Sequence, residues 1–327
     1  MKKTQKVMAA IPRIRENQVL RDFTTFRVGG VADYFFEAFT IDELVAVVRK
    51  AVEYQIPYFI LGNGSNIIFS DYGFPGLVIK NSTANIAFMP EKSQIMADSG
   101  VVLSRLITKA VSENLSGLEF LYGVPGTVGG AIYGNAGAYG TAIGDYVKNL
   151  TILMIDPKDG LPKISQYDHT WMKFAYRSTF LKKIKTKMKP IILSVRFQLA
   201  QNQKEEIMRR LNSFKNKRQD SQPIGLSAGC IFKNPIPKEL RDFEGIGTKN
   251  MPELPEERRA GFMLEKAGVK KLKIGQAEVS SKHANFILNT DKAKAADIRA
   301  LIEEMRDKVK NKFGVVLEEE IEYIGQW

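Results

Sequence analysis

The sequence of 327 residues contains very little cysteine and histidine. Cys230 is its only cysteine, so the chain cannot form an internal disulfide, and a reducing compartment is the simplest expectation. Because only two histidines accompany that cysteine, a metal site built from histidine and cysteine is not expected, and we assign no metal. The composition therefore argues against disulfide-rich secreted domains and against zinc proteins.

Long apolar runs are missing as well. No segment approaches the roughly 18 consecutive apolar residues that a membrane-spanning helix needs. Residues 1–12 carry three lysines and one short apolar run at 7–11, which is too brief for the core of a secretory signal. These features predict a cytoplasmic protein without a membrane partner.

Acidic residues are outnumbered, 36 against 48 lysines and arginines, which gives a formal net charge of +12. Part of the excess lies in two basic runs, at 182–189 and 204–218. Such a charge favours polyanionic partners, and an ordinary solvated basic surface explains it equally well. No helix-turn-helix, RNP, KH or zinc-finger signature is present, so the sequence does not favour nucleic acid as the partner.

Helical and strand patterns alternate along the first third of the chain. Thr40-Ile-Asp-Glu43 has the form of a capping box and opens an amphipathic helix that ends before Pro57. Further along, the pattern predicts strands at 58–61, 67–69 and 77–79 and a helix at 101–114. With 44% hydrophobic residues, this order indicates a globular protein of α+β or α/β class, with two domains or one large domain.

The remainder continues the mixed pattern. Strands are predicted at 150–155 and 191–199, and a charged helix at 201–219 marks a domain boundary near residue 200. The last helix has one apolar face and ends at Gly314, before a final strand at 315–324. The residues of that face are Ile298, Leu301, Ile302, Met305, Val309 and Phe313.

Two glycine-rich segments are candidates for binding a phosphate group. Gly62-Asn-Gly-Ser-Asn66 follows a predicted strand, and consecutive N–H groups in such a turn can form an anion site. The segment is neither a Walker A loop nor a Gly-x-Gly-x-x-Gly motif, and a plain tight turn is the alternative. Eight glycines follow between 122 and 144, a density that argues against a stable helix and favours backbone wrapped around an extended dinucleotide.

Eight sequence blocks in register resemble one family, the UDP-N-acetylenolpyruvoylglucosamine reductases. From residue 22 to the C-terminus they are Phe23-Thr-Thr-Phe-Arg-Val-Gly-Gly30, Leu61-Gly-Asn-Gly-Ser-Asn66, Gly123-Val-Pro-Gly-Thr-Val-Gly-Gly130 with Asn135-Ala-Gly-Ala-Tyr-Gly140, Ala175-Tyr-Arg-Ser178, Ser227-Ala-Gly-Cys-Ile-Phe-Lys-Asn-Pro235, Ala260-Gly-Phe-Met-Leu-Glu-Lys-Ala-Gly268, His283-Ala-Asn-Phe-Ile-Leu-Asn289 and Gly314-Val-Val-Leu-Glu-Glu-Glu320. Lys271 and Gln276 interrupt a stretch that relatives make richer in glycine, so the loop geometry there is open.

The resemblance implies a flavoenzyme that uses NADPH to reduce UDP-N-acetylglucosamine enolpyruvate to UDP-N-acetylmuramate in peptidoglycan precursor synthesis. It also implies an α+β fold: an N-terminal extension at 1–20, a two-part FAD-binding domain of the PCMH (vanillyl-alcohol-oxidase) type at 21–200, and a smaller α+β substrate-binding domain at 201–327. The FAD is expected to be non-covalent, because no histidine lies in the loop at 62–66. The residues expected to hold it are Gly62, Asn63, Gly64, Ser65, Asn66, Pro125, Gly126, Thr127, Gly129, Gly130, Asn135 and Gly137.

Three residues match the family's catalytic positions. The resemblance implies that Arg177 holds the substrate carboxylate and, with Glu320, stabilises the enolate formed when hydride reaches C3. Cys230 stands where many relatives have the serine that protonates C2, and a free thiol, with a pKa of about 8.5, is a better acid than a hydroxyl. Each has a plainer reading: surface packing for Arg177, a small buried apolar residue for Cys230, and for Glu320 a solvated strand face shared with Glu318 and Glu322. If those three glutamates instead form a like-charged cluster, one pKa would rise and Glu320 could assist the protonation.

Lys233, Asn234 and His283 are candidates for contacts with the substrate, although each fits a structural role equally well. Two other functions remain open at this point. A flavoprotein oxidase would explain the glycine-rich segments but not the C-terminal blocks, and a basic nucleic-acid-binding protein would use the lysine runs.

Overall fold

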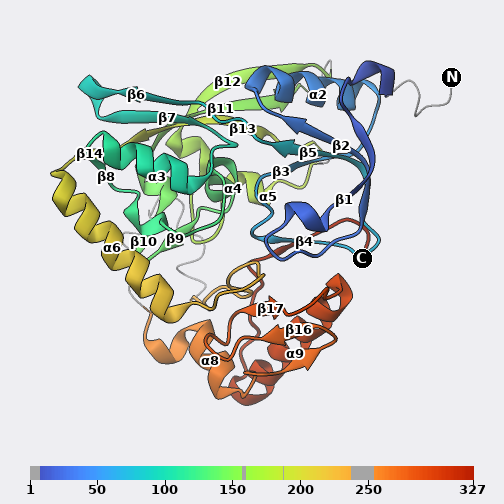
Figure 1. Ribbon diagram of the computed structural model, residues 1–327, viewed down its shortest axis with the longest axis vertical. Helices are drawn as coiled ribbons and strands as arrows, with labels where there is room; N and C mark the ends of the chain where they lie inside the picture. The colour runs from blue at the N-terminus through green and yellow to red at the C-terminus, as the bar shows by residue number, and fades with distance from the viewer. Residues whose placement is uncertain (1–7, 157–159, 187, 237–253) are drawn as a thin grey trace.

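The computed structural model describes residues 8–156, 160–186, 188–236 and 254–327. Within them the chain forms a larger unit built on two sheets and a smaller unit formed by the C-terminal part of the chain (Figure 1). The smaller unit lies below the larger one in this view, and α6 (Lys204–Ser221) runs along one side from the larger unit toward the smaller unit.

The first sheet of the larger unit has the strand order β1-β2-β5-β3, with β1 at Arg15–Val19, β2 at Val31–Ala38, β5 at Phe74–Asn81 and β3 at Tyr58–Leu61. Strand β5 pairs in parallel with β2 and β3, and β1 pairs antiparallel with β2. The predicted amphipathic helix is α2 (Ile41–Glu53), which connects β2 to β3 and buries Leu44 and Val48. The Oγ1 atom of Thr40 accepts the N–H of Glu43, which confirms the predicted helix start.

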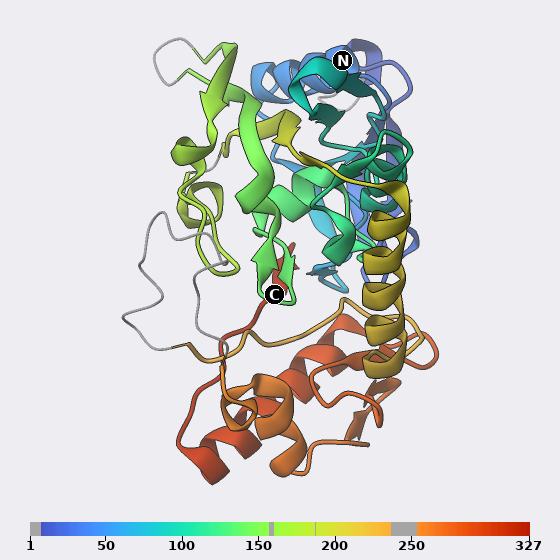
Figure 2. The ribbon, with the colours of Figure 1, turned by 90° about the vertical axis from the view of Figure 1, so that its left-hand side faces the viewer.

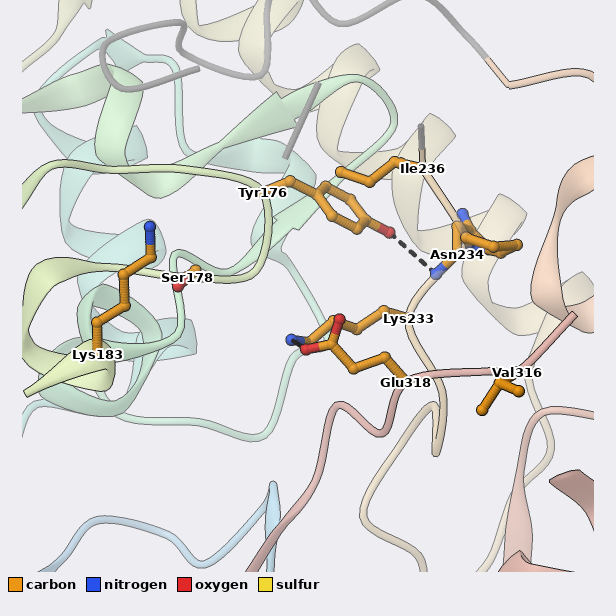
Figure 3. Close-up of a pocket in the computed structure, with 9 residues that line it drawn as sticks. Tyr176, Ser178, Lys183, Lys233, Asn234, Ile236, Val316 and Glu318 are labelled. Atoms are coloured by element: carbon orange, nitrogen blue, oxygen red, sulfur yellow. Dashed lines mark hydrogen bonds and ion pairs between the residues drawn. The ribbon is translucent and has the colours of Figure 1, made fainter. Parts of the chain in front are cut away.

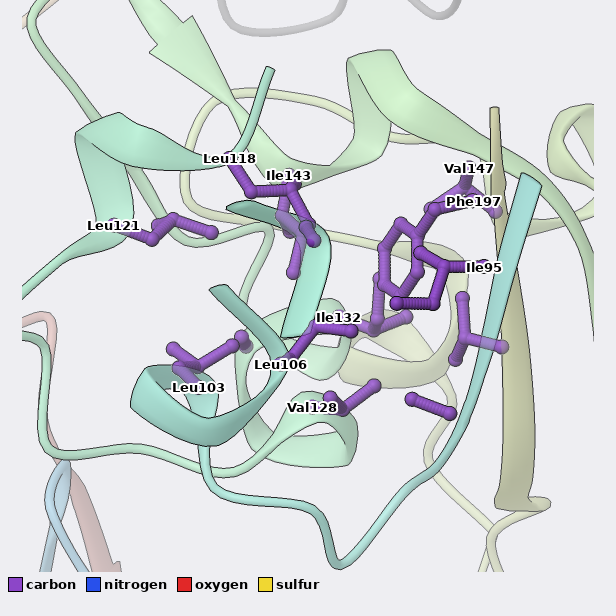
Figure 4. Close-up of a cluster of buried hydrophobic side chains, with 14 of the residues drawn as sticks. Ile95, Leu103, Leu106, Leu118, Leu121, Val128, Ile132, Ile143, Val147 and Phe197 are labelled. Atoms are coloured by element: carbon purple, nitrogen blue, oxygen red, sulfur yellow. The ribbon is translucent and has the colours of Figure 1, made fainter. Parts of the chain in front are cut away.

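The second sheet is antiparallel throughout, in the order β12-β11-β13-β7-β6. Its strands are β12 (Pro162–Asp168), β11 (Val147–Ile155), β13 (Ile191–Gln198), β7 (Gln94–Asp98) and β6 (Ile86–Met89). Helices α3 (Leu103–Ser112) and α4 (Val128–Tyr133) pack with this sheet around a hydrophobic core (Figure 4). The larger unit also contains two short antiparallel strand pairs, β8 (Leu115–Ser116) with β14 (Ala200–Gln201) and β9 (Gly137–Ala138) with β10 (Thr141–Ala142). The short helix α5 (Phe180–Lys183) lies in the same unit.

The glycine-rich stretch contains a short helix, so the expectation of no helix there is wrong for α4. Both Gly129 and Gly130 lie in its first turn. The helix forms because tertiary contacts offset the poor helix propensity of glycine: the N–H of Gly129 donates to the Ser99 carbonyl, and Val128 and Ile132 are fully buried. A Cβ on Gly129 would lie 2.9 Å from the Cβ of Ser99, so the close approach requires glycine.

The smaller unit consists of α8 (Ala260–Lys266), α9 (Ala295–Phe313) and a sheet of β15 (Lys273–Ile274), β16 (Ala277–Val279) and β17 (Ile287–Asn289). The predicted apolar face of α9 is buried, and Gly314 ends the helix with a left-handed φ of 68°. Figure 2 shows α6 beside the larger unit. Two apolar side chains of α6, Ile207 and Leu211, belong to the hydrophobic core of that unit.

The end of the chain returns to the larger unit. Strand β18 (Glu322–Ile324) pairs in parallel with β4 (Ile67–Phe69). The strand expected at 315–324 is therefore too long, because the residues before 322 join the segment that follows Cys230 through one bridge, Phe232 with Glu319, and not through a continuous ladder. Both α6 and β18 follow residue 200 in the sequence and contact elements that precede it. The expected division of the chain at residue 200 stays a prediction.

Asp71 links the two units at the start of α9. Its two carboxylate oxygens accept the backbone N–H groups of Ala295 and Ala296 at 2.9 and 3.0 Å. These N–H groups lie in the first turn, where a helix has no internal acceptor and where negative charge is favourable. Asp71, more than 220 positions away in sequence, therefore supplies the acceptors for this helix end.

We predict that Asp71→Ala lowers the free energy of unfolding by about 1–2 kcal/mol, because two first-turn N–H groups lose their acceptor. Urea denaturation followed by circular dichroism measures the change. Asp33→Ala, which removes an exposed carboxylate from β2, is the control and should shift the midpoint little. Equal midpoints for the two variants would contradict the assigned role of Asp71.

Candidate active site

The two glycine-rich segments lie against each other at one end of the first sheet. The side-chain amide of Asn63 donates to the Pro125 carbonyl at 3.1 Å. A Cβ on Gly62 would lie 2.6 Å from the Oγ1 of Thr127, so only glycine allows this approach. The structure therefore brings together two loops that are about 60 residues apart in sequence.

Backbone N–H groups in these loops are left without protein acceptors. Among the described residues, no N–H of residues 63–66, of Gly126 or of Thr127 donates to a protein group. Gly64 has a φ of 57°, which turns the chain tightly between β3 and β4. Adjacent free N–H groups on a tight turn attract an anion such as a diphosphate. This is the geometry that the sequence predicted for the loop at 62–66.

Arg177 lies at the tip of a two-residue turn. The N–H and carbonyl groups of Ala175 and Ser178 bond each other, which closes the turn around Tyr176 and Arg177. Arg177 adopts a left-handed φ of 51°, a conformation that costs a non-glycine residue free energy. Its Nε atom lies 3.1 Å from Glu320 Oε1, and both side chains are largely buried. Burial lowers the pKa of Arg177, but the nearby Glu320, Tyr176 and Cys230 together outweigh burial and hold that pKa above its usual value.

Three alternate glutamates of residues 318–322 pair with different cations. Glu318 bonds Lys233, Glu320 pairs with Arg177, and Glu322 lies 2.9 Å from the amino group of Lys182. The like-charged cluster considered from the sequence is therefore not what the structure shows, since each carboxylate has its own partner. Glu320 is also fixed through its main chain: its N–H donates to the Ile231 carbonyl, and its carbonyl accepts the side-chain amide of Asn66 at 3.1 Å.

The charges of Glu320 and Arg177 also act on the thiol of Cys230. Burial, helped by the nearby Glu320, raises the pKa of Cys230 to about 12 against the opposing charges of Arg177 and Arg218. The value of about 8.5 belongs to a free thiol in water, and the fold raises the pKa of Cys230 above it. The thiol keeps its proton throughout the neutral range, as a proton donor must.

A cavity of about 160 Å³ opens beside the Arg177 turn. It is lined by Tyr176, Ser178, Lys183, Lys233, Asn234, Pro235, Ile236, Val316 and Glu318 (Figure 3). The Tyr176 hydroxyl accepts the N–H of Asn234 at 3.3 Å, and the amino group of Lys233 points toward the carboxylate of Glu318. Two of the three predicted substrate residues, Lys233 and Asn234, thus line one polar cavity.

His283 does not line this cavity. Its Nδ1 atom accepts the N–H of Asn285, and its ring packs edge-on against Phe286. Burial lowers the pKa of His283, so the imidazole is neutral at neutral pH. The predicted contact between His283 and a substrate has no counterpart in this arrangement and stays a prediction.

The remaining residues predicted to hold the cofactor lie near the two loops. Gly129 and Gly130 begin α4, and Gly137 packs in the β9–β10 hairpin, where a Cβ would approach the Thr141 carbonyl at 2.8 Å. Asn135 is buried, and both ends of its side-chain amide bond protein main chain. A contact between its amide and a cofactor therefore has no support in the structure.

Sequence reasoning named neither Lys80 nor Tyr176. The amino group of Lys80 donates to the Gly62 carbonyl at 2.6 Å and to Asn63 Oδ1 at 3.1 Å. These two bonds fix the start of the glycine-rich loop at 62–66. A lysine directly after the apolar run 77–79 was the available signal. Tyr176 lies inside the quoted Ala175–Ser178 block, and its position beside Arg177 was the signal there.

Comparison with known proteins agrees with this geometry. The family model described as UDP-N-acetylenolpyruvoylglucosamine reductase, C-terminal domain, matches residues 221–324, and an FAD binding domain model matches residues 32–158. Reductases of that name from Caldicellulosiruptor saccharolyticus and Carboxydothermus hydrogenoformans are each 37% identical, over 95% and 96% of this chain and 92% and 94% of theirs. The chain belongs to the UDP-N-acetylenolpyruvoylglucosamine reductase family.

The crystal structure of the reductase from Thermus caldophilus is similar as well, with a TM-score of 0.73 and 31% identity over 95% of this chain and 99% of that one. The resemblance inferred from the eight blocks and the two-part α+β fold are thereby confirmed. Members of this family are oxidoreductases of peptidoglycan precursor synthesis, so this chain is an oxidoreductase with an FAD-binding domain. In the described residues, no helix is long and apolar enough to cross a membrane.

We predict that Cys230 reacts very slowly with iodoacetamide at pH 7, and that its rate still rises between pH 8 and 10. With the pKa of Cys230 raised to about 12, about one thiol in 10⁵ is ionised at pH 7, and only the thiolate reacts. Because Cys230 is the only cysteine, mass spectrometry of the whole chain reports this site alone. Urea-unfolded protein serves as the control, and a folded-state rate that levels off near pH 9 would contradict the prediction.

Proposed function

We propose that the protein reduces UDP-N-acetylglucosamine enolpyruvate to UDP-N-acetylmuramate with NADPH as the reductant and FAD as a non-covalent cofactor. The observation that carries the proposal is the ion pair of Arg177 and Glu320 beside a protonated Cys230, next to a loop with free N–H groups. Family membership supports the reaction. NADPH as the reductant rests on the family resemblance, and the choice of acting residues rests on their motif positions and on the site geometry.

The loops at 62–66 and 125–127 fit the diphosphate of FAD. Their unpaired N–H groups supply donors for phosphate oxygens, and Lys80 holds the first loop in place through its bonds to Gly62 and Asn63. FAD bound there would supply the hydride that reaches C3 of the enolpyruvyl group. The residues of this chain then have two tasks, which are to stabilise the negative charge that develops and to protonate C2.

Arg177 is suited to the first task. Its guanidinium is planar and permanently charged, so it can hold the substrate carboxylate and the developing enolate at once. The ion pair with Glu320 fixes the direction of the guanidinium in a partly buried site, where a preoriented charge stabilises a developing anion strongly. Glu320 thus contributes to stabilisation of the enolate through Arg177. The negative charge of Glu320 is itself balanced by Arg177 before substrate binds.

Cys230 is suited to the second task. Its thiol is protonated at neutral pH, and the charges of both Glu320 and Arg177 act on it. Proton transfer to a carbanionic C2 leaves a thiolate, which Arg177 and Arg218 stabilise through their positive charges. Arg177 therefore stabilises the enolate before the transfer and, with Arg218, the thiolate after it.

The polar cavity beside the Arg177 turn fits the nucleotide part of the substrate. Lys183 and Lys233 place positive charge on its wall, and Tyr176 and Asn234 provide further hydrogen-bonding groups. A diphosphate sugar carries negative charge and hydroxyl groups, which such a lining complements. We propose that Lys233 and Asn234 contact the substrate here, and His283 is not part of this wall.

An anaerobic visible spectrum tests the proposed function. The purified protein should show flavin absorbance that NADPH bleaches and that UDP-N-acetylglucosamine enolpyruvate then restores. Bleaching without recovery on adding this substrate would leave a flavoprotein and overturn the proposed reaction. Protein that takes up no FAD on reconstitution would overturn the assignment of the two loops.

We predict that Cys230→Ala keeps its FAD and is still reduced by NADPH, while turnover with the enolpyruvyl substrate falls about 10²–10⁴-fold, as for a lost general acid. Cys230→Ser retains a hydroxyl that can donate a proton and should keep substantial activity. Steady-state turnover and the flavin spectrum measure both variants. Full activity of the alanine variant, or an inactive serine variant with intact flavin, would count against the donor role.

A further inference from the structure

The residues proposed to act on the substrate lie outside continuous helices and sheets. Arg177 is at the tip of a turn, and Cys230 makes a single bridge with Phe286. Such segments lack the repeated hydrogen bonds that fix a strand in a sheet. Their positions must therefore be set by other contacts, because a displacement of about 1 Å in an active site can cost 10²-fold in rate.

A buried asparagine bonds the turn that carries Arg177. The side-chain amide of Asn135 donates to the Ala175 carbonyl at 2.8 Å, and its Oδ1 accepts the N–H of Gly144 at 3.1 Å. Asn135 is 2% exposed, so water does not compete for either bond. The first residue of the turn is thus tied to the loop that follows α4.

A second buried asparagine bonds the segment that carries Cys230. Asn285 is 3% exposed, and its side chain makes two bonds with one residue: Oδ1 accepts the Phe232 N–H at 2.9 Å, and the amide donates to the Phe232 carbonyl at 2.8 Å. Its main-chain carbonyl accepts the N–H of Ile231. The side chain of Asn285 therefore extends to Phe232 the short main-chain pairing that residues 285 and 286 make with Cys230 and Ile231. His283 in turn accepts the N–H of Asn285.

We propose that Asn135 and Asn285 are positioning residues, of which the first sets the place of Arg177 and the second the place of Cys230. A carboxamide suits this role because it offers a donor and an acceptor to main chain without adding a titratable charge near Glu320. The inference rests on the proposed function for its kinetic consequence, whereas the bonds themselves do not depend on it. It gives Asn135, expected from the sequence to bind the cofactor, a different role.

The two half-reactions, followed by stopped-flow absorbance, separate positioning from general damage. In Asn135→Ala and Asn285→Ala, FAD content and the rate of reduction by NADPH should stay near the wild-type values. The limiting rate of reoxidation at saturating enolpyruvyl substrate should fall about 10–100-fold, because only that step uses Arg177 and Cys230. Loss of FAD from Asn135→Ala, with normal reoxidation in the molecules that retain it, would overturn the positioning role of Asn135.

Asn289→Ala is the matched control. Asn289 is 6% exposed, and its amide donates to the Phe26 carbonyl while its Oδ1 accepts the Ala293 N–H, each at 2.9 Å. None of these partners belongs to the segments of Arg177 or Cys230. This variant should lose stability as the other two do and keep both half-reaction rates. If reoxidation slows equally in all three variants, the effect is structural and the proposal fails.

Alkylation of Cys230 gives a second readout that needs no flavin and no substrate. In Asn285→Ala the segment is released, so labelling by iodoacetamide at fixed pH should be on the order of 10-fold faster than in the wild type. Asn135→Ala and Asn289→Ala should label at the wild-type rate. An unchanged rate in folded Asn285→Ala would overturn the positioning role of Asn285.

The two readouts distinguish the proposal from the function on which it rests. If wild-type reduced flavin is not reoxidised by the substrate, the proposed function fails, while the labelling rates still decide the role of Asn285. If the wild type turns over and the variants match it, the function stands and the positioning roles fail. Where an alanine variant cannot be purified folded, the corresponding serine variant, which keeps at most one of the two bonds, is judged by the same criteria.

Discussion

The active-site geometry depends on the ion pairs made by one returning segment. Residues 318–322 run from the smaller unit to the larger one, and their carboxylates meet cations from four separate places in the chain. Lys233 follows the segment of Cys230, Arg177 and Lys182 belong to the larger unit, and Arg306 lies on α9. Removing one partner of a largely buried pair leaves a charge without compensation, which is far more costly than losing an exposed pair. The segment is thereby fixed at both ends and along its length.

This arrangement connects the loop that we propose binds the cofactor with the residues that we propose act on the substrate. Asn66, the last residue of the glycine-rich loop, donates to the carbonyl of Glu320, and its own carbonyl accepts the N–H of Glu322. The loop with free N–H groups is therefore continuous, through one side chain, with the partner of Arg177. A change in the loop's position would be felt by Glu320 and then by the guanidinium that we propose holds the substrate. The proposed binding loop and the proposed catalytic residues thus share hydrogen bonds and ion pairs that need both units.

Local sequence signals predicted the elements that depend on local physics. The helix opened by Thr40 and the helix ended by Gly314 lie where capping and periodicity placed them, since both features act within a few residues. Strand β2 was not predicted, because its pairing with β5 is decided by residues some 40 positions away. The helix α4 was excluded on glycine content alone, although packing against Ser99 and the core outweighs that penalty. The final strand was drawn too long for the same kind of reason, since its partner changes at residue 322.

The candidate site was predictable in its membership more than in its geometry. Family motifs named Arg177, Cys230 and Glu320, yet the ion pair at 3.1 Å and the high pKa of the thiol, raised by burial, arise only when distant segments meet. For the same reason the sequence could not show that the amide of Asn135 bonds main chain, or that His283 faces Asn285 and not the cavity. A side chain's role followed from its motif, whereas its partners followed from the fold.

The parallel pairing of β18 with β4 also bears on how the molecule acquires its activity. Partners such as Ile67 and Glu322 are separated by 255 positions along the chain, so closing this contact requires a very long loop to be ordered first. Contacts of such high sequence separation form slowly and late in folding. Until the last strand docks, Glu320 is absent from its place opposite Arg177, and a chain whose two units are already folded would still be inactive. The site that we propose is catalytic is therefore complete only once this final strand has docked.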